Sequence, residues 1–78
     1  MTKPMAELPD LLALSPKMAN RAWMKWLADV YPLNGKFIPA ASDVGMAIAE
    51  WGLERGKSNE DGARKNLSAR IETLKAAM

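Results

Sequence analysis

The chain has 78 residues, of which 49% are hydrophobic and 26% charged, and its net charge is +2. This is the composition and length of one small globular domain rather than of a disordered chain. The absence of cysteine and histidine excludes a disulfide framework, a thiolate zinc site and the side chain most used for acid–base chemistry near neutral pH. The charge permits binding to nucleic acid without demanding it.

The sequence offers no membrane or export signal. No segment approaches the roughly 20 apolar residues of a membrane span. The N-terminal stretch MTKPMAELPD lacks the long apolar core of a secretory signal. We therefore expect a cytoplasmic protein.

Residues 1–14 read as an N-terminal arm or short helix, ahead of a single helical domain over residues 15–78. Pro9 suits the start of one helical turn through DLLAL. The residue before Pro16 is pushed out of the α-helical region, which ends that turn. The leucines of this segment are expected to pack on the core.

The first main helix is predicted over residues 16–31. Ser15 is a good N-cap and Pro16 suits the first helical position. Apolar residues follow with helical spacing, at Met18, Ala22, Trp23, Trp26, Leu27 and Val30. The two tryptophans should anchor the buried face, and the helix should stop before Pro32.

A short extended segment is predicted at 36–38, followed by a second helix over residues 42–55. Pro39 argues against a central strand, so Phe37 and Ile38 should close one side of the core. Ser42 is the expected N-cap of the second helix. Its buried face is expected to contain Val44, Ala47, Ile48 and Trp51, and the small residues Gly45 and Ala49 permit close approach of a neighbouring helix.

The stretch GLERGKSNEDGARKNL predicts a capped turn between two helices. Gly56 suits a left-handed C-cap, and Ser58 an N-cap with Asp61 three residues later. The last helix is expected over residues 59–77, with Ala63, Leu67, Ile71, Leu74 and Met78 on its buried face. The predicted fold class is therefore all-α, a compact bundle of three main helices.

Catalytic chemistry finds no support in the sequence. The acidic residues fall at capping or surface spacings rather than as a convergent pair, and no phosphate-binding glycine loop occurs. We expect a protein that is not an enzyme and that uses no cofactor or metal.

The stretch SDVGMAIAEWGLERGKSNEDGARKNLSARIETLKA, residues 42–76, resembles the helix pair of helix-turn-helix and winged-helix DNA-binding proteins among bacterial and phage regulators. The resemblance implies a role in transcription regulation, with the C-terminal helix presented to duplex DNA. The residues it implies for DNA binding are Lys57, Asn59, Arg64, Lys65 and Ser68, with Arg21 and Lys25 as auxiliary phosphate contacts. Arg64 would be the best reader of bases, because its guanidinium can pair with guanine.

A second interpretation is a small helical interaction module or inhibitor, of the kind that phages and plasmids encode. Six methionines and three tryptophans are many for so small a domain, and methionine-rich surfaces adapt well to partners. The partner surface would then lie around Met24, Tyr31 and Trp51. Steep salt dependence would indicate DNA, and weak salt dependence a protein. A homodimer fits both interpretations.

Overall fold

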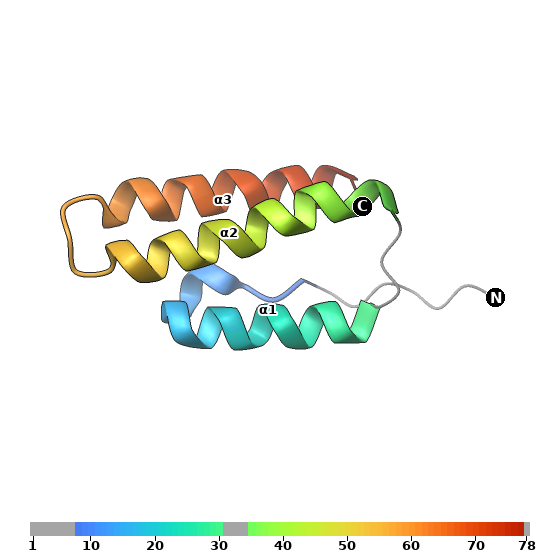
Figure 1. The fold of residues 1–78 in the computed structure, drawn as a ribbon, viewed down its shortest axis with the longest axis horizontal. Coiled ribbons are helices and arrows are strands. Elements are labelled where there is room, and N and C mark those ends of the chain that lie inside the picture. Colours follow the sequence, from blue (N-terminus) through green and yellow to red (C-terminus); the bar gives the residue numbers. More distant parts are fainter. Residues whose placement is uncertain (1–7, 31–34, 78) are drawn as a thin grey trace.

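The computed structural model describes residues 8–30 and 35–77. Within these stretches the chain is helical and contains no strand (Figure 1). The elements in order are η1 (Leu11–Ala13), α1 (Pro16–Val30), η2 (Gly35–Phe37), α2 (Ile38–Glu54) and α3 (Glu60–Ala77). The predicted all-α fold with three main helices is confirmed, and η1, a single turn of 3-10 helix, matches the expected N-terminal helical turn.

α2 is the central helix of the fold. α3 runs antiparallel beside α2, and α1 lies on the other side of α2 (Figure 1). The N-terminal segment that carries η1 contacts α1 and also reaches α3, where residues 8–12 share a hollow with Ile71 and Ser68. This segment therefore fills the place where α1 and α3 would otherwise face each other across a gap.

α1 begins as predicted. The Ser15 hydroxyl accepts a hydrogen bond from the Met18 N–H at 3.3 Å, and Pro16 occupies the first helical position. The Ala19 N–H donates to the Ser15 carbonyl at 2.7 Å and closes the first turn. The predicted final residue, Tyr31, lies outside the described residues.

The predicted extended segment at 36–38 and the predicted helix start at Ser42 are both wrong. η2 occupies this region, and α2 begins at Ile38 with Pro39 in its first turn. Proline fits there because the first N–H groups of a helix have no acceptor within it. Ser42 is consequently an exposed residue inside α2, and Ile38 is 55% exposed instead of closing the core. Phe37 is buried as predicted.

The turn between α2 and α3 contains the predicted left-handed glycine but a different cap. Gly56 has φ of +79°, the conformation that glycine adopts without strain. α3 begins at Glu60 rather than at 59, and the Ala63 N–H donates to the Asn59 carbonyl at 3.0 Å. The capping side chain is that of Glu60, which reaches back to the Gly56 N–H, in place of the predicted pairing of Ser58 with Asp61.

The core lies between α2 and its neighbours. Trp23 and Trp26 of α1 are buried and stacked on each other, with ring centroids 5.2 Å apart and planes inclined by 17°. Trp51 is the largest fully buried side chain. The remaining buried hydrophobic residues are Leu11, Ala19, Phe37, Ala41, Val44, Ala47, Ile48, Ala63, Leu67, Ile71 and Leu74. The predicted inward faces of the three helices are thereby confirmed for the described residues, except that Met18 is 48% exposed. Met78 lies outside the described residues.

Glycines allow α1 to approach α2 closely. A Cβ placed on Gly45 would lie 3.4 Å from Trp23 Nε1, and one placed on Gly52 would lie 3.7 Å from Pro16 Cβ. The predicted close approach at Gly45 is confirmed. The two contacts also place the start of α1 beside the end of α2, so these helices are antiparallel.

Candidate interaction surfaces

Arg64 is held against the protein rather than directed outward. Its guanidinium carbon lies 5.2 Å from the centroid of the Trp51 ring, a cation–π distance. Its Nη2 donates a hydrogen bond to the Leu12 carbonyl oxygen at 3.2 Å. The side chain thus joins α3 to α2 and to the N-terminal segment.

Glu60 closes the turn beside Arg64. Its Oε1 accepts a hydrogen bond from the Gly56 N–H at 3.0 Å, and its Oε2 accepts one from Trp51 Nε1 at 3.2 Å. These two hydrogen bonds, the first being the larger effect, stabilise the carboxylate and lower the pKa of Glu60 below its ordinary value of 4.5. Nearby Arg55 and Arg64 act in the same direction.

The other residues predicted for DNA binding do not form one basic face. Lys57 and Asn59 are exposed in the turn, and Lys65 is exposed on the outward side of α3. At 100° per residue, Asp61 and Glu72 share that side with Lys65. Ser68 is half-buried in the hollow beneath the N-terminal segment. The outward side of α3 therefore carries mixed charge.

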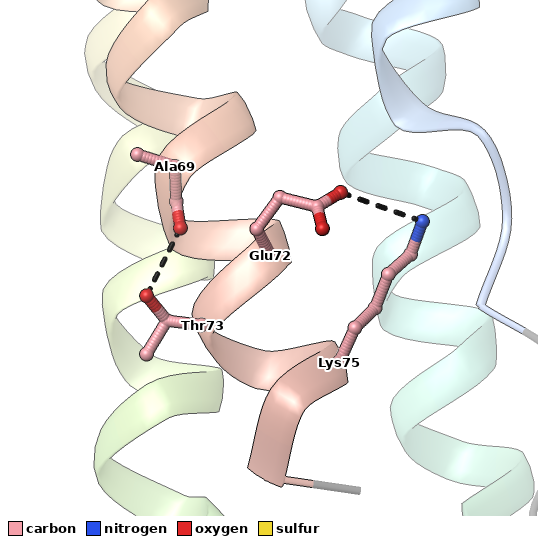
Figure 2. A network of polar contacts seen from close by, with 4 residues as sticks. All are labelled: Ala69, Glu72, Thr73 and Lys75. Carbon is pink, nitrogen blue, oxygen red and sulfur yellow. Dashed lines mark hydrogen bonds and ion pairs between the residues drawn. The ribbon is translucent and has the colours of Figure 1, made fainter.

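The last turns of α3 also engage their polar groups locally (Figure 2). Lys75 Nζ lies 3.9 Å from Glu72 Oε1, and the Thr73 hydroxyl donates to the Ala69 carbonyl oxygen at 3.0 Å. An exposed pair of this kind contributes little to stability or to recognition. It does neutralise part of the positive charge near the C-terminal end of the helix.

α1 carries a more uniform basic surface, here named the α1 stripe and defined by Lys17, Arg21 and Lys25. These residues are exposed and spaced by four, so they lie along one side of the helix opposite Trp23. Arg21 and Lys25 were predicted as contacts, whereas Lys17 was missed. The spacing of four was the signal in the sequence that could have found it.

The arrangement of α2 and α3 differs from a helix-turn-helix, in which the two helices meet at about 90–120°. Here they lie antiparallel, joined by the turn that contains Gly56 (Figure 1). α3 is covered by α2 along one side and by the N-terminal segment along another. The resemblance to helix-turn-helix proteins therefore still rests on the sequence alone.

The outward side of α2 is apolar, and we name it the α2 seam. Ile38, Met46 and Leu53 are 55%, 62% and 72% exposed, and Ser42 and Ala49 lie between them. At 3.6 residues per turn, these five positions fall within about 80° of one another. Sequence reasoning missed the seam because it began the helix at 42 and assigned Ile38 to the core.

An open groove runs beside the seam, between α1 and α2. It consists of two hollows that share Ala49. One is lined by Pro16, Lys17, Asn20, Ile48, Ala49, Gly52 and Arg55, and the other by Trp23, Leu27, Ile38, Ala41, Ser42, Gly45, Met46 and Ala49. Small residues form much of its floor, and Lys17 and Arg55 line its basic end.

Only part of the predicted apolar partner surface is exposed. Met24 is 58% exposed on α1, whereas Trp51 is 1% exposed and belongs to the core. Tyr31 lies outside the described residues. Trp51 is buried because α3 and the Arg64 side chain pack over it. The helical periodicity of α2 alone does not show this covering.

The described parts of the chain hold no group of three acidic residues placed to bind a metal ion. Neither is any helix within residues 8–30 and 35–77 both long and apolar enough for a bilayer crossing. Comparison with protein-family models, curated proteins and solved structures gave no match.

Proposed function

We propose that this protein is a small protein–protein interaction module that binds a helix through the α2 seam and the adjoining groove. The observation that carries the proposal is the exposure of Ile38, Met46 and Leu53 on one side of the central helix. Large apolar side chains that are exposed together on one side of a small domain are a feature of protein interaction sites.

The contrast among the three helices supports this proposal. The outward side of α1 presents the α1 stripe, and that of α3 presents Asp61, Lys65 and Glu72. α2 has three large apolar residues in a row opposite its buried face, whereas the exposed Met18 and Met24 of α1 lie on either side of the cations of the α1 stripe. The buried hydrophobic residues of the described stretches form one core cluster, and Ile38, Met46 and Leu53 lie outside it.

The groove favours a helical partner. Ala41, Gly45, Ala49 and Gly52 keep its floor low along α2. A helix about 10 Å wide can then approach the backbone of α2 and place apolar side chains at every third or fourth position against the seam. Met46 on the rim has the flexibility to adapt to such side chains.

Selection from a phage-displayed library of amphipathic helical peptides tests this function. We expect wild-type protein to enrich peptides with apolar residues at helical spacing, and Met46→Lys to lose them. Ala69→Lys is the matched control, since it adds the same charge on exposed α3. Peptides that bind Met46→Lys as well as wild type, or no enrichment at all, would contradict the proposal.

The α1 stripe supports a second candidate, binding to duplex DNA. Three cations in line on one helix can contact successive phosphates, and Arg55 lies near Lys17 to extend them. The ligand is again duplex DNA, as the sequence predicts, but the main contact is made by α1 and not by α3. The C-terminal helix would then contribute Lys65 from its flank.

Fluorescence anisotropy with random duplex DNA at two salt concentrations tests this candidate. Arg21→Ala/Lys25→Ala should reduce the slope of log K against log salt by about 2, because each phosphate contact contributes about 0.9. Lys65→Ala should change it by less than about 1. Absence of binding at low salt by the folded wild type would exclude DNA as the partner.

A further inference from the structure

We infer that the helix received by the α2 seam is α2 of a second copy of this chain, docked antiparallel about a two-fold axis between Gly45 and Met46. This inference rests on the function proposed above. It goes further by naming the partner and the register, both of which follow from the spacing of residues along the seam.

The seam is self-complementary when it is reversed. Ile38 and Leu53 lie equally far from the midpoint between Gly45 and Met46, and so do Ser42 and Ala49. A two-fold axis at that midpoint brings Ile38 level with Leu53 of the second copy, at both ends of the contact. In a two-fold interface both copies use the same surface, so that each residue i that contacts residue j of the second copy is matched by a contact from j to i.

The axis also places a large side chain of one copy opposite a small residue of the other. The same axis brings Met46 level with Gly45 of the second copy, where the groove has its floor. Ser42 comes level with Ala49, so two small side chains meet there. Met46, 62% exposed in the single chain, would enter the hollow of the second copy and be enclosed.

α1 extends the contact on the groove side. Asn20 and Leu27 both line the groove, and the exposed Met24 is their neighbour on the helix surface, on the side toward Lys17. A two-fold axis perpendicular to α2 keeps both copies of α1 on one side of the interface. The dimer is thus an antiparallel arrangement of four helices, two from each copy.

The area matches what a weak dimer needs. The seam from Ile38 to Leu53 is about 23 Å long, and two helices side by side are about 20 Å wide. The footprint is then roughly 500 Å², about a tenth of the accessible surface of 5419 Å². A specific interface covers about this fraction of a small protein, and one at the lower end of the range is typical of reversible association.

Charges flank the seam without entering it. In this register Glu50 comes level with Ala41 of the second copy, two positions from its Asp43, and Lys36 comes level with Arg55, one position from Glu54. Like charges therefore approach each other on either side of the centre, charges of both signs meet near the ends, and solvent and salt screen both. We expect the dissociation constant to change less than about threefold between about 0.1 and 0.5 M salt.

Sedimentation equilibrium on the whole chain from about 1 to 500 µM measures the association. Wild type should pass from monomer to dimer within this range. Met46→Lys and Leu53→Lys should each weaken the dimer at least about tenfold, since each buries a charge in an apolar contact. Ala69→Lys, on exposed α3, should dimerise as wild type. A wild type that stays monomeric throughout would overturn the inference.

Disulfide trapping tests the register, because the chain has no cysteine of its own. An equal mixture of Ile38→Cys and Leu53→Cys should form the mixed 38–53 disulfide on oxidation. Each variant alone should cross-link at most one tenth as fast. Predominant 38–38 and 53–53 disulfides would instead show a parallel pair and overturn the antiparallel register.

The two proposals fail in different ways. A monomeric wild type that still selects helical peptides in a Met46-dependent manner would retain the interaction function and lose only the second copy as partner. A monomeric wild type that selects no peptides would remove both. A dimer that is insensitive to Met46→Lys and Leu53→Lys would place the interface elsewhere and overturn the inference.

Discussion

Arg64 of α3 lies over the ring of Trp51 of α2, with the guanidinium carbon 5.2 Å from the ring centroid. The same guanidinium donates to the Leu12 carbonyl oxygen, so three segments of the chain meet at one side chain. The residue that seemed best suited to read a base is therefore part of the tertiary structure. A loss of DNA binding on its removal would have to be separated from a loss of stability.

Arg64→Ala should lower the free energy of unfolding by about 1–2 kcal/mol, because it removes a cation–π contact and a charge-assisted hydrogen bond at a half-buried site. Lys65→Ala, one residue along and exposed, should change it by less than about 0.5 kcal/mol. Urea unfolding followed by circular dichroism measures both. Equal effects of the two substitutions would contradict the structural role of Arg64.

Glu60→Gln should remove a pH-dependent part of the stability. The pKa of Glu60 is lowered in the folded state, so its carboxylate stabilises the fold above its ordinary pKa of 4.5. That contribution is lost as the pH falls below 4.5 and through the lowered pKa. Melting temperatures at pH 7 and pH 3 should show wild type well above Glu60→Gln at pH 7, with the difference shrinking at pH 3.

Asp61→Asn is the control for that experiment. It removes a negative charge from the same helix end without touching Gly56 or Trp51. At pH 7 the melting temperature of Asp61→Asn should differ from that of wild type by less than the melting temperature of Glu60→Gln does. If Asp61→Asn and Glu60→Gln behave alike, the effect belongs to the helix dipole in general and not to the hydrogen bonds of Glu60.

Gly45→Leu should destabilise the protein by about 1–3 kcal/mol, because even a Cβ there lies 3.4 Å from Trp23 Nε1 and the remaining atoms would separate α1 from α2. Gly62→Leu is the matched substitution, at a helical glycine with no atom within 4 Å of its Cβ position. It should be neutral or stabilising by about 0.5 kcal/mol through helix propensity. Thermal unfolding of both variants distinguishes them, and destabilisation by Gly62→Leu of similar size would be inconsistent with the close approach.

Gly56→Ala should cost about 1 kcal/mol, because φ of +79° strains any residue that carries a Cβ. Ser58→Ala changes an exposed residue of the same turn and should have little effect. Chemical denaturation of the two variants provides the comparison. A harmless Gly56→Ala would mean that the turn adopts another conformation in solution.

The inward faces of the helices followed from the sequence, whereas the start of α2 did not. Ser15 and Pro16 together form a strong local start signal, and the structure uses it. The sequence allows α2 to begin near Ile38 or near Ser42, and by residue type Ser42 is the better N-cap. Burial of Phe37 and the acceptance of Pro39 in the first turn moved the start to Ile38, through contacts with distant parts of the chain.

The candidate surfaces depended even more on long-range contacts. The spacing of Lys17, Arg21 and Lys25 is visible in the sequence, and the α1 stripe could have been predicted in full. Whether Arg64 faces solvent could not, because its partners are Leu12 and Trp51, remote in sequence. The exposure of Met46 likewise depended on which side of α2 the neighbouring helices cover.

The sequence by itself determined an all-α domain, the inward face of each main helix and the left-handed turn at Gly56. Periodicity, capping and glycine conformation are local properties, and the chain carries them residue by residue. Only the tertiary structure decided that Arg64 and Glu60 hold the turn and that the α2 seam is left uncovered. Which side of a helix stays open depends on how the other elements pack around it, and helical spacing alone does not contain that information.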